Sequence, residues 1–167
     1  MELYPWIVFL HVVGVLVFFI AHGTSMSVAF RLKRERDPAR IRALLDLSSW
    51  TFGLWTSLAF VVGVVAGIAA GIMGGWFGQA WIWIALVLLV GVSGAMTPMV
   101  AMRLNAIRAA AGTRAINPFS RKPPEAPPVQ DDAELERLLA AWDPRPAALM
   151  GMASFVIILW LMYFKPL

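Results

Sequence analysis

The stretch LSSWTFGLWTSLAFVVGVVAGIAAGIMGGWFGQAWIWIALVLLVGVSGAMTPMVAM, from Leu47 to Met102, contains no Asp, Glu, Lys or Arg. It is long enough for two membrane-spanning helices of about 20 residues each, joined by a short turn. Over the whole chain 60% of residues are hydrophobic and 14% are charged, whereas about a quarter of the residues of a soluble domain are charged. The sequence therefore predicts an integral membrane protein.

Hydropathy predicts an all-α fold, a four-helix bundle that forms a single transmembrane domain over residues 1–167. The expected spans are residues 5–30, 48–73, 80–102 and 147–164. Pro5 suits the first turn of a helix, where its missing N–H is not needed. The N-terminus lacks the basic segment and cleavage site of a signal peptide, so we expect the first apolar segment to remain as a span.

The positive charges predict the orientation of these spans. Thirteen of the fourteen Lys and Arg residues lie in segments 31–47 and 103–146, and the remaining one is Lys165. Cytoplasmic loops carry the excess of Lys and Arg, so both termini should lie outside a bacterial inner membrane. The net charge of +4 thus reflects topology, and we expect the lipid bilayer as a partner and no nucleic acid.

The cytoplasmic segment before the last span divides into two parts. Residues 113–130 contain five prolines and predict an extended linker. Residues 131–142 predict a short amphipathic helix, capped by Asp131 with Glu134 in capping-box spacing. We expect this helix to lie against its own protein, with the membrane surface or a partner protein as the alternatives.

Small residues predict how the spans pack. Gly63, Gly67 and Gly71 recur every four residues, a ridge that allows close helix approach. We expect small residues of the later spans to face this ridge: Gly91, Gly94, Ala95, Ala147 and Gly151. The alternative is that the ridge faces a flat cofactor or a second subunit. Pro98 should distort the third span, with Ser93 and Thr97 placed to satisfy a freed backbone group.

The two histidines, His11 and His22, are the main functional lead. They lie eleven residues apart on the first span, roughly 20° out of register and about 16 Å apart along a helix. Ionisable residues inside a membrane are costly and often functional. We expect them to be axial ligands of haem b, with Gly14 leaving room for the edge of the macrocycle. Alternatively, each histidine bonds a Ser, a Thr or a backbone carbonyl across a helix interface.

A second ligand for each haem would come from methionine, because the chain has no third histidine. Met162 lies near the expected depth of His11, and Met96 and Met99 lie near that of His22. His–Met ligation is ordinary for haem. A homodimer that pairs each histidine with its own mate, or a larger membrane complex, is the alternative.

Copper is the other candidate metal. Soft Met and His ligands select Cu(I), and methionines recur at residues 96, 99 and 102. His11 and His22 would then be metal ligands. The chain has no cysteine, which excludes thiolate metal sites and covalent haem attachment. No residue is predicted to be catalytic, and the sequence does not decide whether the protein is an enzyme.

Three short motifs, FLHVVG (9–14), RERDPAR (34–40) and GGWFGQAWIW (74–83), resemble one bacterial membrane family. It is the group of uncharacterised integral membrane proteins loosely related to copper-resistance protein D. The likeness covers roughly the first 110 residues and implies a membrane protein of four or more helices with a haem or copper link. The Leu10–His11 pair is also similar to the opening of four-helix, haem-containing protoporphyrinogen oxidases. The chain departs from them at Val15–Phe19 and in lacking basic residues in the later spans.

Three functions remain open at this point. The first is membrane electron transfer through b-type haem, and the second is copper handling. The third is a non-catalytic subunit or scaffold, in which the acidic helix and the glycine ridge are interaction surfaces.

Overall fold

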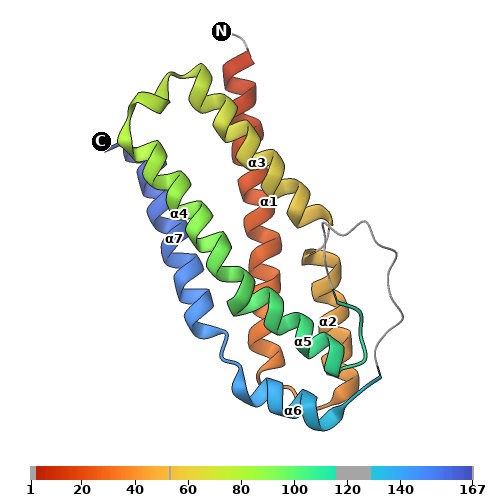
Figure 1. The fold of residues 1–167 in the computed structure, drawn as a ribbon. Helices are drawn as coiled ribbons and strands as arrows, with labels where there is room; N and C mark the ends of the chain where they lie inside the picture. Colours follow the sequence, from red (N-terminus) through yellow and green to blue (C-terminus); the bar gives the residue numbers. More distant parts are fainter. Residues whose placement is uncertain (1–2, 53, 116–128, 167) are drawn as a thin grey trace.

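In a computed structural model, which describes residues 3–52, 54–115 and 129–166, the chain folds into helices, and these residues contain no strand (Figure 1). Four helical segments are long and apolar enough to cross a membrane: Leu3–Leu32, Thr56–Met73, Ala80–Ala110 and Arg145–Phe164. The prediction of an all-α fold with four helices that could span a membrane is therefore confirmed.

The helices follow one another along the chain with short connections. In order they are α1 (Leu3–Leu32), α2 (Pro38–Phe52), α3 (Leu54–Met73), the 3₁₀ turn η1 (Trp76–Gly78), α4 (Ala80–Met96), the π-helical turn η2 (Thr97–Ala101), α5 (Met102–Ala110), α6 (Asp132–Ala141) and α7 (Arg145–Phe164). The central part of the predicted linker, residues 116–128, lies outside the described residues.

The long helices pack as two pairs, α1 with α3 and α4 with α7. A stack of Phe19 on Phe155, with ring centroids 4.1 Å apart, joins α1 of one pair to α7 of the other. Both chain ends lie at one end of the bundle, and α2, α5 and α6 gather at the other (Figure 1). We call these the terminal end and the basic end. Of the twelve Lys and Arg residues that the structure describes, eleven lie at the basic end, and the twelfth is Lys165.

Residues 31–47, expected to be a loop, instead form the end of α1, a short link and most of α2. Asp37 begins α2, because its carboxylate accepts the Ala39 N–H at 2.9 Å. Ile41 and Leu45 are then fully buried against α1, α5 and α6. The apolar spacing of three and four residues from Ile41 onward was the sequence signal for this helix, but the surrounding charges obscured it. The expected span 48–73 consequently includes the end of α2 as well as α3.

Pro98 distorts the third span as predicted, and the distortion is a π-helical turn. Proline has no N–H to donate to the Gly94 carbonyl, and that carbonyl accepts the Thr97 N–H instead. The Thr97 hydroxyl in turn donates to the Ser93 carbonyl at 3.3 Å. The helix then continues as α5 and ends at Gly112, whose φ of +70° favours glycine.

Helix α6 lies against its own protein, as expected. Its apolar side chains Leu135 and Leu139 are buried in a core with α1, α2 and α5. The Asp131 carboxylate accepts the Glu134 N–H at 3.0 Å and so caps the helix. The reciprocal half of the capping box does not form, because the Asp131 N–H donates to the Ala110 carbonyl at 2.9 Å. The Glu134 carboxylate pairs with Arg137 instead.

The other end of α6 is held by a lysine at the end of α1. Lys33 Nζ donates to the carbonyls of Leu139 and Ala140, at 3.1 and 2.8 Å. A cation at a helix C-terminus satisfies carbonyls that have no partner within the helix and complements the helix dipole. The helix is thus fixed at both ends and along its apolar face.

Candidate functional site

The histidines lie along the crossing of α1 and α3. At its centre a Cβ added to Gly14 would lie 2.8 Å from Gly63 Cα, so the two backbones are in contact. At Gly63 and Gly67 the small-residue ridge of α3 therefore packs against α1, not against the third and fourth spans as predicted. At Gly71 it does face the third span, since a Cβ there would lie 2.8 Å from Ile82 of α4. Gly14 also leaves no room for a macrocycle, because the backbone of α3 already fills that space.

His11 spans this crossing. Its Nδ1 lies 2.7 Å from the Gly63 carbonyl oxygen, and its ring lies over Gly67, where a Cβ would come within 2.7 Å of Nδ1 and Cε1. A carbonyl oxygen only accepts hydrogen bonds, so Nδ1 carries the proton and the neutral ring has its lone pair on Nε2. Within the described parts of the chain, Nε2 has no hydrogen-bond partner, and His11 is partly exposed.

His22 lies on the same side of α1 and is held by aromatic contacts. Its ring stacks on Phe18 with centroids 5.6 Å apart and an angle of 22° between the planes. Phe18 in turn packs against Phe60 of α3, at 5.2 Å. His11 thus makes the bond to a backbone carbonyl that the structural alternative describes, and His22 stacks on a side chain that contacts α3.

The candidate methionines take part in helix packing. The Met96 methyl group lies against Gly151 of α7, 2.9 Å from where a Cβ would be. Met162 is partly buried beside Trp81, Ile82 and Leu161 at the terminal end. Met99 is partly exposed within the π-helical turn. Among the described residues, no three His, Cys, Asp or Glu side chains come close enough to hold a metal ion.

Sequence reasoning missed Arg108, which is buried at the basic end with 2% of its surface exposed. Its guanidinium donates to the Leu45 carbonyl at 2.9 Å, to the Ser49 hydroxyl at 2.6 Å and to the Ser48 hydroxyl. This arginine joins α5 to α2. The available sequence signal was a lone arginine among apolar helix neighbours, Leu104 and Ile107.

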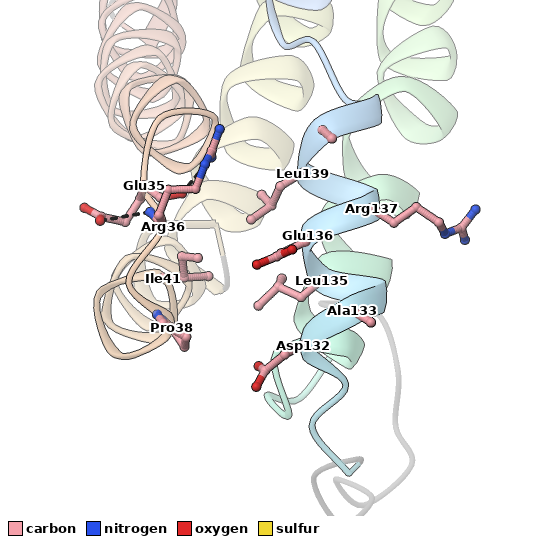
Figure 2. A pocket seen from close by; sticks show the side chains of 11 residues that line it. Glu35, Arg36, Pro38, Ile41, Asp132, Ala133, Leu135, Glu136, Arg137 and Leu139 are labelled. Atoms are coloured by element: carbon pink, nitrogen blue, oxygen red, sulfur yellow. Dashed lines mark hydrogen bonds between the residues drawn. The ribbon is translucent and has the colours of Figure 1, made fainter.

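A recess of about 530 Å³ opens at the basic end, between α6 and the link from α1 to α2 (Figure 2). Leu135, Leu139 and Glu136 point from α6 toward α2, whereas Arg137 points away from it. Apolar side chains and charged side chains of both signs line the recess, and neither histidine does.

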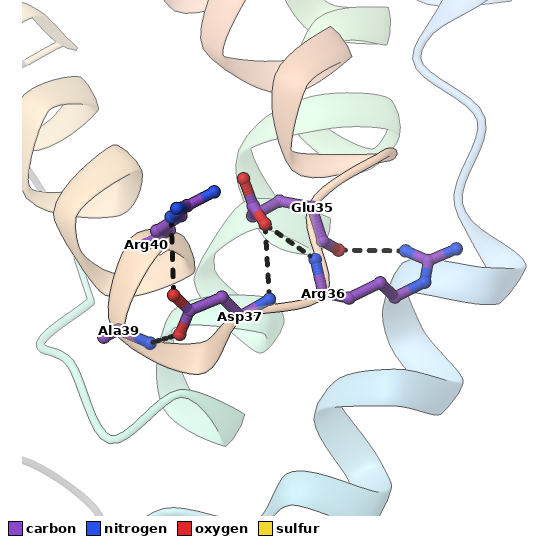
Figure 3. A network of polar contacts seen from close by, with 5 residues as sticks. All are labelled: Glu35, Arg36, Asp37, Ala39 and Arg40. Atoms are coloured by element: carbon purple, nitrogen blue, oxygen red, sulfur yellow. Dashed lines mark hydrogen bonds and ion pairs between the residues drawn. The ribbon is translucent and has the colours of Figure 1, made fainter.

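The charges of the adjoining link are satisfied locally (Figure 3). The Glu35 carboxylate accepts the N–H groups of Arg36 and Asp37, at 3.0 and 3.3 Å, and these bonds lower the pKa of Glu35. Arg36 donates to the Glu35 carbonyl at 2.9 Å, and Asp37 pairs with Arg40 at 3.4 Å. These contacts order the turn between α1 and α2 and leave its ionic groups little need of a ligand.

Comparison of the chain with protein families, with curated proteins and with solved structures finds no match. The resemblance to the family related to copper-resistance protein D therefore stays a prediction. The candidate site is a histidine on a helix that could span a membrane. Its tautomer is fixed by a backbone carbonyl, and its second nitrogen has no hydrogen-bond partner among the described residues.

Proposed function

We propose that the protein binds b-type haem within the membrane, with Nε2 of His11 as an axial ligand, and that it transfers electrons. The observation that carries this proposal is the hydrogen bond from His11 Nδ1 to the Gly63 carbonyl. A metal-ligating histidine almost always donates its other ring N–H to a carbonyl, a carboxylate or water, which fixes the tautomer and raises the basicity of the ligand.

The contact of α1 with α3 limits where a porphyrin could lie. The contact of Gly14 with Gly63 closes the space between α1 and α3, so the macrocycle would lie on the Nε2 side of the ring, away from the crossing. Bound haem would supply a one-electron iron couple, whose potential depends on the axial ligands and on burial. The Gly63 carbonyl fixes the position of the imidazole, and Gly67 leaves room for the ring.

The second axial ligand of a haem at His11, and the binding of a second metal at another site, stay predictions. His22, Met96, Met99 and Met162 are the candidates for these positions. Copper at His11 would use the same free nitrogen, so metal analysis of the purified protein distinguishes the two metals.

Orientation is the second part of the proposal. The basic end faces the cytoplasm of a bacterial cell, and both termini lie outside the inner membrane. Support comes from the Lys and Arg residues that the structure describes, eleven of which gather at one end of the bundle while Lys165 lies at the other; this is the charge asymmetry of inserted membrane proteins.

The test compares His11→Asn with His11→Ala in protein purified from haem-replete cells. The amide nitrogen of asparagine occupies nearly the position of Nδ1, so His11→Asn keeps a donor for the Gly63 carbonyl but has no Nε2 ligand. We expect both variants to lose visible absorbance, and we expect His11→Asn to remain close to the wild type in thermal stability. Full retention of haem by His11→Asn would show that this histidine is structural only.

His22→Asn is the matched control on the same helix. It makes the same change of side chain at a position whose ring stacks on Phe18. If His11 alone binds haem, His22→Asn keeps the visible absorbance of the wild type. If each variant instead loses part of that absorbance, each histidine binds a haem.

A further inference from the structure

A second pocket, of about 250 Å³, lies at the basic end beside the π-helical turn. One wall is formed by Pro98, Met102 and Ile107, from the turn and α5, and the other by Leu138 and Trp142, at the end of α6. Arg103 stands at its edge. The pocket therefore combines apolar walls with one cation, at the level where the third span leaves its apolar stretch.

Trp142 carries an unsatisfied donor. The side chain is 3% exposed, and its Nε1–H is a buried side-chain group without a hydrogen-bond partner in the described residues. Native proteins leave few such groups unpaired, and each one calls for a water, an ion or a ligand. An indole N–H can only donate, so its partner must be an acceptor.

Arg103 points to the charge of that acceptor. It is exposed, and within the described parts of the chain it makes no ion pair or hydrogen bond. Arg103 and Trp142 line the same pocket, and a guanidinium and an indole N–H are both suited to donate to a phosphate oxygen. The nearby Arg108, in contrast, is already engaged by α2.

The face of α4 above the pocket is smooth. Gly94 and Gly91 precede Pro98 by four and seven residues and so lie on the same side of the helix. Both glycines are exposed, and a Cβ at either position would meet nothing within 4 Å. An extended apolar chain leaving the pocket toward the terminal end could lie along this face.

From these contacts we infer that the pocket binds an anionic phospholipid. Arg103 and the Trp142 indole hold the phosphodiester, Met102 and Leu138 enclose the glycerol region, and an acyl chain lies along Gly94 and Gly91. The site is independent of haem, because neither histidine lines it.

The full chain, freed of lipid in an uncharged detergent, tests this assignment by native mass spectrometry and thermal unfolding. Phosphatidylglycerol, phosphatidylcholine and glycerol phosphate are titrated separately. We expect phosphatidylglycerol to bind most tightly and to raise the melting temperature. Arg103→Gln should weaken its binding by about tenfold, the change expected from one charge-assisted hydrogen bond. Trp142→Phe, which keeps an aromatic ring, should weaken it by several-fold.

Arg114→Gln is the matched control, since it removes one exposed positive charge that does not line the pocket. It should bind phosphatidylglycerol as the wild type does, and Arg103→Gln should melt at the wild-type temperature when no lipid is present. Equal weakening by both variants would show diffuse attraction and overturn the assignment. Equal binding of the two phospholipids would also overturn it, and stabilisation by glycerol phosphate alone would assign the pocket to a free anion.

Discussion

Replacing Gly14 by alanine should loosen the α1–α3 crossing, although alanine is the better helix former. The added Cβ would lie 2.8 Å from Gly63 Cα and N, and 3.1 Å from the Ala59 carbonyl oxygen. Carbon atoms in contact prefer separations of about 3.5–4.0 Å. All three neighbours are backbone atoms, so the helices must move apart rather than a side chain rotate.

The magnitude follows from comparison with Gly23→Ala on the same helix. A Cβ at Gly23 meets nothing within 4 Å, and both substitutions gain the same helix propensity of about 1 kcal/mol. That shared gain cancels in the difference, which leaves the cost of overpacking, about 1–3 kcal/mol. Gly14→Ala should therefore be less stable than Gly23→Ala by this amount.

The assay is reversible unfolding of both variants and the wild type in the same detergent, followed by circular dichroism. Gly14→Ala should also change the environment of His11, because a wider crossing lengthens its bond to the Gly63 carbonyl. Equal stability of Gly14→Ala and Gly23→Ala would refute the backbone contact between Gly14 and Gly63, on which the position of His11 against α3 depends.

Three further predictions concern the basic end. Arg108→Ala should destabilise the protein by about 2–4 kcal/mol through the cavity it leaves. Arg108→Met should recover most of that loss in thermal unfolding, since the Ser48 hydroxyl still donates to the Leu45 carbonyl. Lys33→Met should lower the stability of the protein by about 1 kcal/mol, because it removes the cation at the C-terminus of α6, and it should speed amide exchange in residues 132–141. Unchanged exchange would contradict a stabilising role of the bonds from Lys33 to Leu139 and Ala140. The hydrogen bond from Arg137 lowers the pKa of Glu134, so this stabilisation is complete above the ordinary glutamate pKa and is lost as pH falls through the lowered folded value. Glu134→Gln should abolish that pH dependence of α6 exchange, and its persistence would assign the dependence to another group.

The four spans could be predicted because length and hydropathy are properties of local sequence. Helix α6 was also predictable, since its cap and its apolar face lie within twelve residues. Helix α2 was missed because Arg40, Arg42 and Asp46 outweigh its apolar spacing when charge is used to define a loop.

Long-range partners were not predictable in the same way. A ridge such as Gly63 and Gly67 fits any smooth helix, and hydropathy does not select α1 from among the other spans. The carbonyl that accepts the His11 N–H is 52 residues away in sequence, and the hydroxyl of Ser48 that accepts from Arg108 is 60 residues away. Which nitrogen of His11 is protonated follows only from that tertiary contact.

The most direct test of the central claim is the absorbance of the wild-type protein, purified in mild detergent from haem-replete cells, before and after reduction with dithionite. If the protein binds b-type haem, the spectrum shows a Soret band with sharp α and β bands on reduction, and the pyridine haemochrome is of the b type. A colourless preparation would contradict haem binding and would leave His11 as an interhelical hydrogen-bond donor.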